Sequence, residues 1–227
     1  MSGEMLSFQS NGGTTSAYLA SPAGGGKGPG VVVIQEWWGL VPHIKSIVDR
    51  FANAGFLALA PDLYHGKSAK SPDEAGKLMM AMNIDKAEQD LSGAVSFLAQ
   101  HPLNSTGKVG TVGFCMGGAL SLYAATRNIN VKACTIFYGG HPNIHPDLPA
   151  LQAPVLGLYA EKDNFVTVSA VAELERKLKE LGKVHEFHTY PGVNHGFFND
   201  ERPEVYDEAA AKDAWKRTLT FFRANLS

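Results

Sequence analysis

KVGTVGFCMGGAL, residues 108–120, decides how the rest of the chain is interpreted. Its first half combines β-branched and small residues and predicts a strand over 108–114, and a helical pattern follows over 117–127. The turn between them matches G-x-C-x-G, a variant of G-x-S-x-G, in which the nucleophile stands on a sharp strand-to-helix turn. Glycine is needed on both sides because the backbone passes too close for a side chain. Cys115 is therefore the candidate nucleophile.

Two backbone features would make Cys115 reactive. A cysteine at the start of a helix faces the positive end of the helix dipole, which favours a thiolate. The N–H group of Met116, the next residue, would point toward an oxyanion that forms on the substrate. The alternative is that Cys115 is a small buried hydrophobic residue in a glycine-rich turn, a role that suits cysteine.

Apolar runs and helical patterns alternate along the whole chain. Strands are expected at 6–9, 15–20, 31–35, 56–60, 108–114, 131–139, 154–160 and 184–190. Helices are expected at 43–54, 72–81, 85–100, 117–127, 168–181 and 204–224. Asn-Gly-Gly between the first two strands is typical of a β-hairpin. This order predicts one α/β domain over 1–227, with a mostly parallel central sheet, helices on both faces and an N-terminal β-hairpin.

Composition and charge argue against several classes of protein. The chain of 227 residues is 44% hydrophobic, enough for a sizeable core, and its net charge of −2 comes without a basic block that would indicate nucleic-acid binding. The longest apolar runs are too short to span a bilayer, and MSGEMLSFQS lacks the pattern of a secretory signal. Two cysteines do not make a disulfide framework. We expect a cytoplasmic protein with reduced thiols that binds neither nucleic acid nor membrane.

Two further residues stand where the partners of a nucleophile are expected. Asp163 follows the strand expected at 154–160, and His195 follows the one at 184–190. Catalytic groups of open α/β sheets gather at the carboxyl ends of the strands, and the order nucleophile, acid, histidine accompanies the G-x-S-x-G pattern. His195 would accept and return the thiol proton, while Asp163 would fix its tautomer. The simpler alternatives are an N-cap or turn aspartate and an ordinary loop histidine.

These positions give the chain a resemblance to the dienelactone hydrolase family of α/β-hydrolases over nearly its whole length. The resemblance rests on QEWWG (35–39), APDLYHG (60–66), KVGTVGFCMGGAL (108–120) and the loops that carry Asp163 and His195. It implies the α/β-hydrolase fold and a Cys-His-Asp triad formed by Cys115, His195 and Asp163. It also implies cleavage of small-molecule carboxylic esters or lactones through an acyl-enzyme intermediate, without a cofactor or a metal.

The resemblance also implies a role for Glu36, which follows the strand expected at 31–35. In the family this glutamate holds the resting thiol and yields it to the histidine when substrate binds, which would protect Cys115 from oxidation. The sequence places Glu36 at the carboxyl end of a central strand, where a buried carboxylate needs a partner; the alternative is a solvated glutamate. The N–H of Trp37 should be the second oxyanion donor, beside that of Met116.

The expected substrate pocket departs from the family pattern. Members that open dienelactones hold the substrate carboxylate with two arginines, but residues 69–83 contain none and Asn199 stands where the second is expected. Arg202 lies nearby but out of register, and Lys77 lacks the planar fork of arginine. Apolar residues are expected to line the pocket instead, namely Trp37, Trp38, Met79, Met82, Phe197 and Phe198, with Tyr64 at its edge. We expect the substrate to be a less anionic ester than dienelactone.

Other interpretations of the chain stay open. A non-catalytic binding protein with this fold is one alternative, although such proteins usually lose a member of the triad. A redox-sensing thiol protein is another, although no resolving cysteine lies near Cys115 in the sequence. His141 and His145 are spaced like a metal-binding pair on a helix, but Pro142 and Pro146 favour a loop near the mouth of the site. The oligomeric state is expected to be a monomer or a small homo-oligomer.

Overall fold

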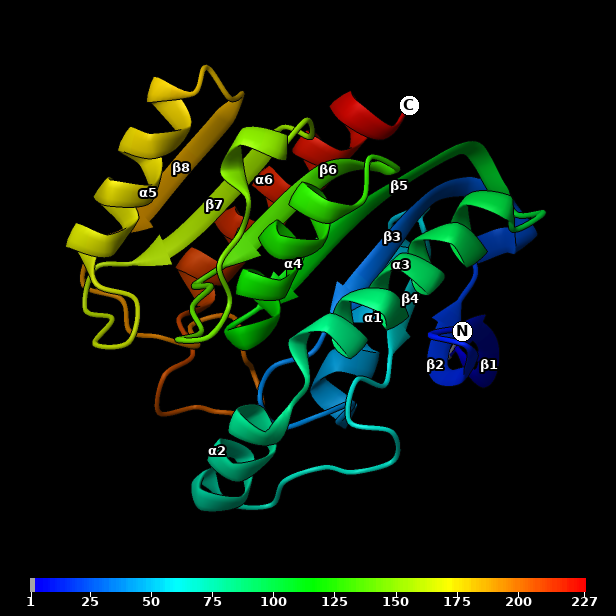
Figure 1. Ribbon diagram of the computed structural model, residues 1–227, viewed down its shortest axis with the longest axis horizontal. Helices are drawn as coiled ribbons and strands as arrows, with labels where there is room; N and C mark the ends of the chain where they lie inside the picture. The colour runs from blue at the N-terminus through cyan, green and yellow to red at the C-terminus, as the bar shows by residue number, and fades with distance from the viewer. Residues whose placement is uncertain (1–2) are drawn as a thin grey trace.

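The computed structural model describes residues 3–227, and at its centre lies an eight-stranded sheet with helices on both sides (Figure 1). The strands are β1 (Glu4–Ser10), β2 (Gly13–Ala20), β3 (Gly28–Ile34), β4 (Leu57–Pro61), β5 (Asn104–Phe114), β6 (Val131–Phe137), β7 (Val155–Ala160) and β8 (His185–Tyr190). The helices are α1 (Pro42–Asn53), α2 (Pro72–Ala81), α3 (Ile84–Gln100), α4 (Met116–Arg127), α5 (Val168–Glu180) and α6 (Glu208–Leu226). The predicted alternation of strands and helices is confirmed.

The sheet has the order β1-β2-β4-β3-β5-β6-β7-β8. The six strands from β4 to β8 in this order are parallel to one another, whereas β2 pairs antiparallel with both β1 and β4. The β1–β2 hairpin turns at Asn11 and Gly12, whose φ angles of 50° and 72° are the left-handed values that tight hairpin turns favour. The parallel run brings the carboxyl ends of β3, β5, β6, β7 and β8 to one edge of the sheet.

Each face of the sheet is covered by its own group of helices, as expected. Helices α3, α4 and α5 cover one face, where Leu91, Leu120 and Val171 belong to a single apolar cluster. Helices α1 and α6 cover the other face, where Ile44 and Phe222 belong to a second cluster. Strand β3 is apolar toward both faces because neither face meets water.

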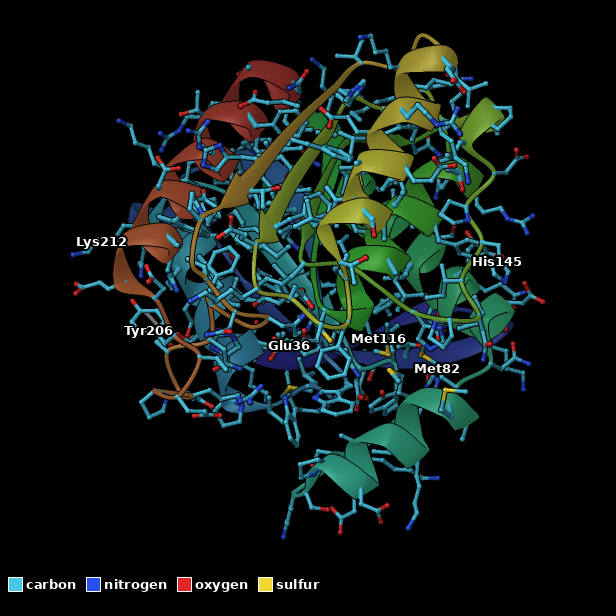
Figure 2. The ribbon with its side chains drawn as sticks, turned by 90° about the vertical axis from the view of Figure 1, so that its left-hand side faces the viewer. Glu36, Met82, Met116, His145, Tyr206 and Lys212 are labelled. Carbon is cyan, nitrogen blue, oxygen red and sulfur yellow. The ribbon has the colours of Figure 1, made fainter. Side chains whose placement is uncertain are left out.

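Helix α2 stands apart from these layers, beyond the carboxyl edge of the sheet in both views (Figure 1, Figure 2). Of its residues, Ala75 alone is buried, and Leu78 and Met79 pack partly against the core. Its side-chain hydrogen bonds are local, such as the one from Lys77 to Asp73. Helix α2 is therefore attached to the body mainly through a few apolar contacts.

The predicted start of the last helix is wrong, and the structure gives the reason. Helix α6 begins at Glu208 rather than at residue 204 because Asp207 is its N-cap, with a side chain that accepts a hydrogen bond from the N–H of Ala210. Within residues 3–227, no helix is long and apolar enough to cross a membrane.

Candidate active site

Cys115 occupies a tight turn between β5 and α4, where its backbone adopts φ 55° and ψ −123°. A residue other than glycine rarely adopts a positive φ, and such strain costs about 1–3 kcal/mol. The turn is held on both sides, because the Cys115 N–H donates to the Phe137 carbonyl at 3.0 Å and the Gly118 N–H donates to the Cys115 carbonyl at 2.9 Å. The side chain is partly exposed. This is the backbone geometry that the G-x-C-x-G pattern predicts.

Glycine is the only residue that fits on either side of this turn. A Cβ atom on Gly113 would lie 1.8 Å from the carbonyl oxygen of Gly117. A Cβ atom on Gly117 would lie 2.4 Å from the carbonyl oxygen of Ile34 and 2.5 Å from that of Gln35. These neighbours are backbone atoms and cannot move aside. The start of α4 therefore packs directly against the end of β3, and Glu36 lies two residues beyond that end.

Asp163 and His195 form a hydrogen-bonded pair beside the turn. The Asp163 Oδ2 atom lies 2.6 Å from His195 Nδ1. The Oδ1 atom accepts from the backbone N–H groups of Phe165 and Val166 at 2.7 and 2.9 Å. Asp163 does not cap α5, whose N-cap is Thr167. The carboxylate therefore closes its own turn with one oxygen and orients the imidazole with the other, as a catalytic histidine requires.

The surroundings of His195 favour its protonated form. Burial lowers the pKa of His195, but hydrogen bonding to Asp163 and Cys115 and their negative charges outweigh burial and raise it to about 10. Because Asp163 occupies Nδ1, the Nε2 atom is the one left for the thiol. The pair can thus hold a proton taken from Cys115 and release it later.

Glu36 is buried at the end of β3, at 3% exposure, and is held by neutral groups. Asn199 Nδ2 donates to Glu36 Oε2 at 2.8 Å, and the Tyr138 hydroxyl donates to Oε1 over 3.5 Å. No hydrogen bond within residues 3–227 joins Glu36 to Cys115. The solvated alternative for Glu36 is therefore wrong, and in this conformation its carboxylate is turned to Asn199 instead of the thiol.

Tyr138 belongs to the site although no motif indicates it. It is fully buried and has a φ of 39°, a second strained residue beside Cys115. Its ring centroid lies 4.9 Å from that of His195. Burial and the negative charges of Glu36 and Cys115 raise the pKa of Tyr138 well above its ordinary value, so its hydroxyl is a neutral donor. Its position at the carboxyl end of β6 was the available signal in the sequence.

Two backbone N–H groups next to this turn have no hydrogen-bond acceptor among residues 3–227. Within residues 3–227, no hydrogen bond uses the N–H of Trp37, which follows β3, or that of Met116, which begins α4. Figure 2 shows Glu36 and Met116 at the same end of the sheet, on the side of α2. Unpartnered N–H groups at this point are the arrangement expected for an oxyanion site.

One cleft of about 480 Å³ unites most of these residues. It is lined by Glu36, Trp37, Trp38, Met79, Cys115, Gly140, His141, Pro142, Phe165, Val166, His195 and Arg202. Asp163 lies behind His195 and is buried. The volume is within the usual range for a small-molecule site, roughly 300–1,000 Å³. Trp37, Trp38 and Met79 line it as expected, whereas Phe165 and Val166 were not anticipated.

Phe197, Phe198 and Met82 do not line the cleft, which corrects the expected pocket. Phe197 is fully buried, with its ring centroid 5.2 Å from that of Tyr138 and 5.1 Å from that of Tyr190. Phe198 is also fully buried. The chain turns inward directly after His195, so these rings gain more by filling the core than by facing a partly wet cleft.

The side chains of Tyr64 and Met116 also lie away from the cleft. Both are buried, and the Tyr64 hydroxyl lies 3.5 Å from Met116 Sδ. Burial and the nearby charge of Cys115 raise the pKa of Tyr64. Tyr64 lines a separate hollow of about 190 Å³ beside α2. Tyr64 therefore packs beneath the turn of Cys115 and does not line the cleft, and neither does Met116.

Arg202 enters the cleft although its sequence position is out of register. Its guanidinium lies 5.9 Å from the ring centroid of Trp38, and its Nη2 atom pairs with Glu204 at 2.8 Å. The N–H of Arg202 donates to the carbonyl of Asn199 at 3.0 Å. This turn folds the chain back. Arg202, three residues after Asn199, therefore reaches the cleft, while the Asn199 side chain bonds to Glu36.

The two histidines of the loop after β6 lie in different surroundings. His141 lines the cleft, and its Nδ1 atom accepts from the N–H of Asn143 at 3.0 Å. Burial lowers the pKa of His141, which favours the neutral ring. His145 is exposed. Over residues 3–227 no group of three or more His, Cys, Asp or Glu side chains is arranged to hold a metal ion.

Known proteins are similar to this chain in sequence and in architecture. The model of the dienelactone hydrolase family matches residues 15–226. The chain belongs to the dienelactone hydrolase family. Protein usf of Aquifex pyrophilus is 41% identical over 232 residues, with 99% of this chain and all of that protein covered. A candidate carboxymethylenebutenolidase of Aquifex aeolicus (strain VF5) is 36% identical over 231 residues, with 99% of each chain covered.

A solved structure of the dienelactone hydrolase family has the same architecture. The crystal structure of a candidate dienelactone hydrolase from Klebsiella pneumoniae subsp. pneumoniae MGH 78578 matches with a TM-score of 0.88 and 31% identity, covering 97% of this chain and 98% of that one. The predicted α/β-hydrolase fold is confirmed. As a member of the dienelactone hydrolase family, the protein is a carboxylic-ester hydrolase with a small-molecule substrate.

Proposed function

We propose that this member of the dienelactone hydrolase family cleaves carboxylic esters or lactones with Cys115 as nucleophile, His195 as general base and acid, and Asp163 as the residue that orients His195. The observation that carries the proposal is the 2.6 Å hydrogen bond between Asp163 Oδ2 and His195 Nδ1, two residues that are 32 positions apart in sequence. This pair accompanies a thiol on a strained turn, that of Cys115. A nucleophile, a base and an orienting carboxylate in this order are what acyl transfer needs.

The reaction has two halves. In the first, the thiol proton passes to His195 Nε2, and the Cys115 sulfur then attacks the carbonyl carbon of the ester. The carbonyl oxygen takes the negative charge and accepts hydrogen bonds from the N–H groups of Trp37 and Met116. The C–O bond to the alcohol then breaks, and the alcohol leaves with the proton from His195. In the second half, water attacks the thioester, which releases the acid and restores the thiol.

Glu36 controls the thiol before substrate binds, in the role that the family resemblance implies. Its support is the burial of Glu36 beside the cleft and its two neutral partners, Asn199 and Tyr138. An amide and a phenol hold a carboxylate less firmly than a bidentate arginine would. The Glu36 carboxylate can therefore leave the Asn199 amide and bind the Cys115 thiol without breaking an ion pair.

The preferred substrate is a less anionic ester than a dienelactone. Trp37, Trp38 and Met79 make much of the cleft apolar, and Arg202, the one Lys or Arg that lines it within residues 3–227, is already paired with Glu204. Comparing kcat/KM for a neutral short-chain aryl ester with that for a dienelactone tests this. A strong preference for the dienelactone would contradict this part of the proposal.

The triad is tested by ester hydrolysis and by mass spectrometry of the acylated protein. Cys115→Ala and His195→Ala should each lower kcat by at least about a thousandfold, and an acyl group should be trapped on Cys115 of the wild type. Cys134→Ala is the matched control, because burial raises the pKa of that thiol to about 12 and it lies in the core. Unchanged activity in both triad variants would defeat the assignment. A wild type without activity on any ester would favour the binding or redox-sensing alternatives.

We further propose a single-domain, cytoplasmic protein that is a monomer or a small homo-oligomer. A single domain over 1–227 is supported by the sheet that all eight named strands share. A cytoplasmic location and a monomer or small homo-oligomer rest on the sequence.

A further inference from the structure

Phe165 is the most exposed large apolar side chain among residues 3–227, at 80%, and yet it lines the cleft. Single exposed apolar residues are common on protein surfaces and need no explanation by themselves. Phe165 differs because its ring faces His195, with centroids 5.3 Å apart and planes at 61°. A large apolar surface is therefore held beside the catalytic base at the mouth of the site.

The position of Phe165 is set by the carboxylate that orients His195. The Phe165 N–H donates to Asp163 Oδ1 at 2.7 Å, while Asp163 Oδ2 lies 2.6 Å from His195 Nδ1. One carboxylate thus fixes the backbone of Phe165 and the imidazole together. Because the hydrogen bond uses the backbone, truncating the Phe165 side chain leaves it in place.

The geometry of the imidazole decides which part of an ester meets Phe165. Since Nδ1 is occupied by Asp163, the proton for the departing alcohol must come from Nε2, with the alcohol oxygen within roughly 2.6–3.2 Å of that atom. The carbonyl oxygen is directed to the N–H groups of Trp37 and Met116, which lie at the end of β3 and the start of α4. The alcohol part of the substrate therefore lies on the His195 side of the cleft, where Phe165 stands.

We propose that Phe165 is the specificity-determining residue for the alcohol part of the substrate, and that this part is apolar and preferably aromatic. The proposal rests on the proposed roles of Cys115 and His195. An aromatic alcohol group would cover the exposed Phe165 ring and gain an edge or stacked contact, whereas a methyl group would leave the ring in water. The acyl part, on the other side of the reacting carbon, would not touch Phe165.

The test compares benzyl acetate with methyl acetate, followed by titration of the acid released. Benzyl alcohol and methanol have nearly equal basicity, so their acetates differ in size and shape much more than in reactivity. The wild type should prefer the benzyl ester, and Phe165→Ala should lower the benzyl-to-methyl ratio of kcat/KM by roughly two- to twelvefold, the range of a single aromatic contact. Phe165→Leu should fall between the two.

Two controls make the test specific. Val184→Ala removes another exposed apolar side chain, 73% exposed, just before β8 and therefore at the opposite end of the strands, and should leave the ratio unchanged. A second pair, methyl hexanoate and methyl acetate, varies the acyl part, and its ratio should be the same in wild type and Phe165→Ala.

The outcomes separate this inference from the proposed function. If Phe165→Ala hydrolyses methyl acetate normally and its benzyl-to-methyl ratio is unchanged, the inference is wrong while the triad stands. The inference is also wrong if Phe165→Ala shifts the acyl ratio or slows both acetates equally. If the wild type hydrolyses none of these esters and no acyl group forms on Cys115, the proposed function fails first, and this inference with it.

Discussion

Asn199 Nδ2 donates a hydrogen bond of 2.8 Å to Glu36 Oε2, and both residues are 3% exposed. The contact joins the end of β3 to the loop that follows His195, 163 residues further along the chain. Asn199 stands where the family pattern expects an arginine. A buried carboxylate at the edge of the active site is therefore satisfied by an amide, and among residues 3–227 no cation pairs with it.

This contact predicts the effect of removing the amide. Asn199→Leu should lower the free energy of unfolding by about 1–3 kcal/mol, because the Glu36 carboxylate, only 3% exposed, loses a hydrogen-bond partner. Urea unfolding with an unchanged m-value measures the loss. In a Glu36→Gln background the same substitution should cost less, since a neutral side chain is cheaper to leave unpaired. A loss below about 0.5 kcal/mol in the wild-type background would show that Glu36 finds another partner.

His195 should make the stability of the protein depend on pH. Its pKa is raised to about 10 in the folded protein, from about 6.5 in an unfolded chain. The folded state therefore binds this proton more tightly, and the resulting stabilisation is complete below about pH 6.5 and disappears as the pH rises through about 10. The stability advantage of the wild type over His195→Gln should shrink across this range.

Unfolding in urea at a series of pH values measures that advantage. Asp163→Asn provides the control, because it removes one of the groups that raise the pKa of His195 and should flatten the dependence. An advantage that stays constant or grows between about pH 6.5 and 10 would be inconsistent with a protonated His195 in the folded state.

Gly117→Ala should damage the turn that carries Cys115. The added Cβ would lie 2.4 Å from the carbonyl oxygen of Ile34, a backbone atom, so β3 and α4 would have to separate. We expect a loss of about 1–3 kcal/mol or more in stability, together with a large loss of activity. Gly76→Ala is the matched control, because its Cβ would meet no atom within 4 Å in helix α2. Thermal unfolding should show that Gly76→Ala is neutral or slightly stabilising.

Arg202 should improve the binding of esters that carry a carboxylate, although less anionic esters stay the better substrates. We expect Arg202→Gln to lower kcat/KM for a nitrophenyl glutarate monoester, relative to nitrophenyl pentanoate, by roughly two- to fivefold, the range of an exposed ion pair. Added salt should lower the glutarate-to-pentanoate ratio of kcat/KM in the wild type, because salt screens the attraction to Arg202. Glu204→Gln should raise this ratio, because the Glu204 carboxylate pairs with the Arg202 guanidinium in the wild type.

Lys77→Gln is the charge-matched control for this experiment. Lys77 pairs with Asp73 on α2 and does not line the cleft. Equal effects of Lys77→Gln and Arg202→Gln would mean that general electrostatic attraction, and not a contact in the cleft, discriminates between the two esters.

The fold could be predicted because its signals are local and repeat along the chain. Short β-branched runs alternate with amphipathic segments, and parallel strands collect their carboxyl ends at one edge. The same rule brings Cys115, Asp163 and His195, which follow β5, β7 and β8, into one site without knowledge of the loops. Their catalytic roles rest on the proposal above, but their proximity follows from topology.

The walls of the cleft could not be predicted, because loop geometry decides them. Phe197 is two residues from His195, and a turn sends it into the core. Arg202 is out of register with the second arginine of the family pattern, yet a hydrogen-bonded turn that begins at Asn199 brings it to the cleft. Phe165 reaches the cleft through a turn closed by Asp163, a contact that the residue types alone do not specify.

The shape of the cleft depends on helix α2, which is weakly attached to the rest of the protein. With Ala75 as its one buried residue, this segment should open at a lower free energy than the sheet, so its amide protons should exchange with solvent sooner than those of β5. Met79 lines the cleft from α2 and would leave its wall if α2 opened. For a bulky ester, the rate of entry would then be governed by the local unfolding of ten residues, while the reacting groups stay on the rigid sheet.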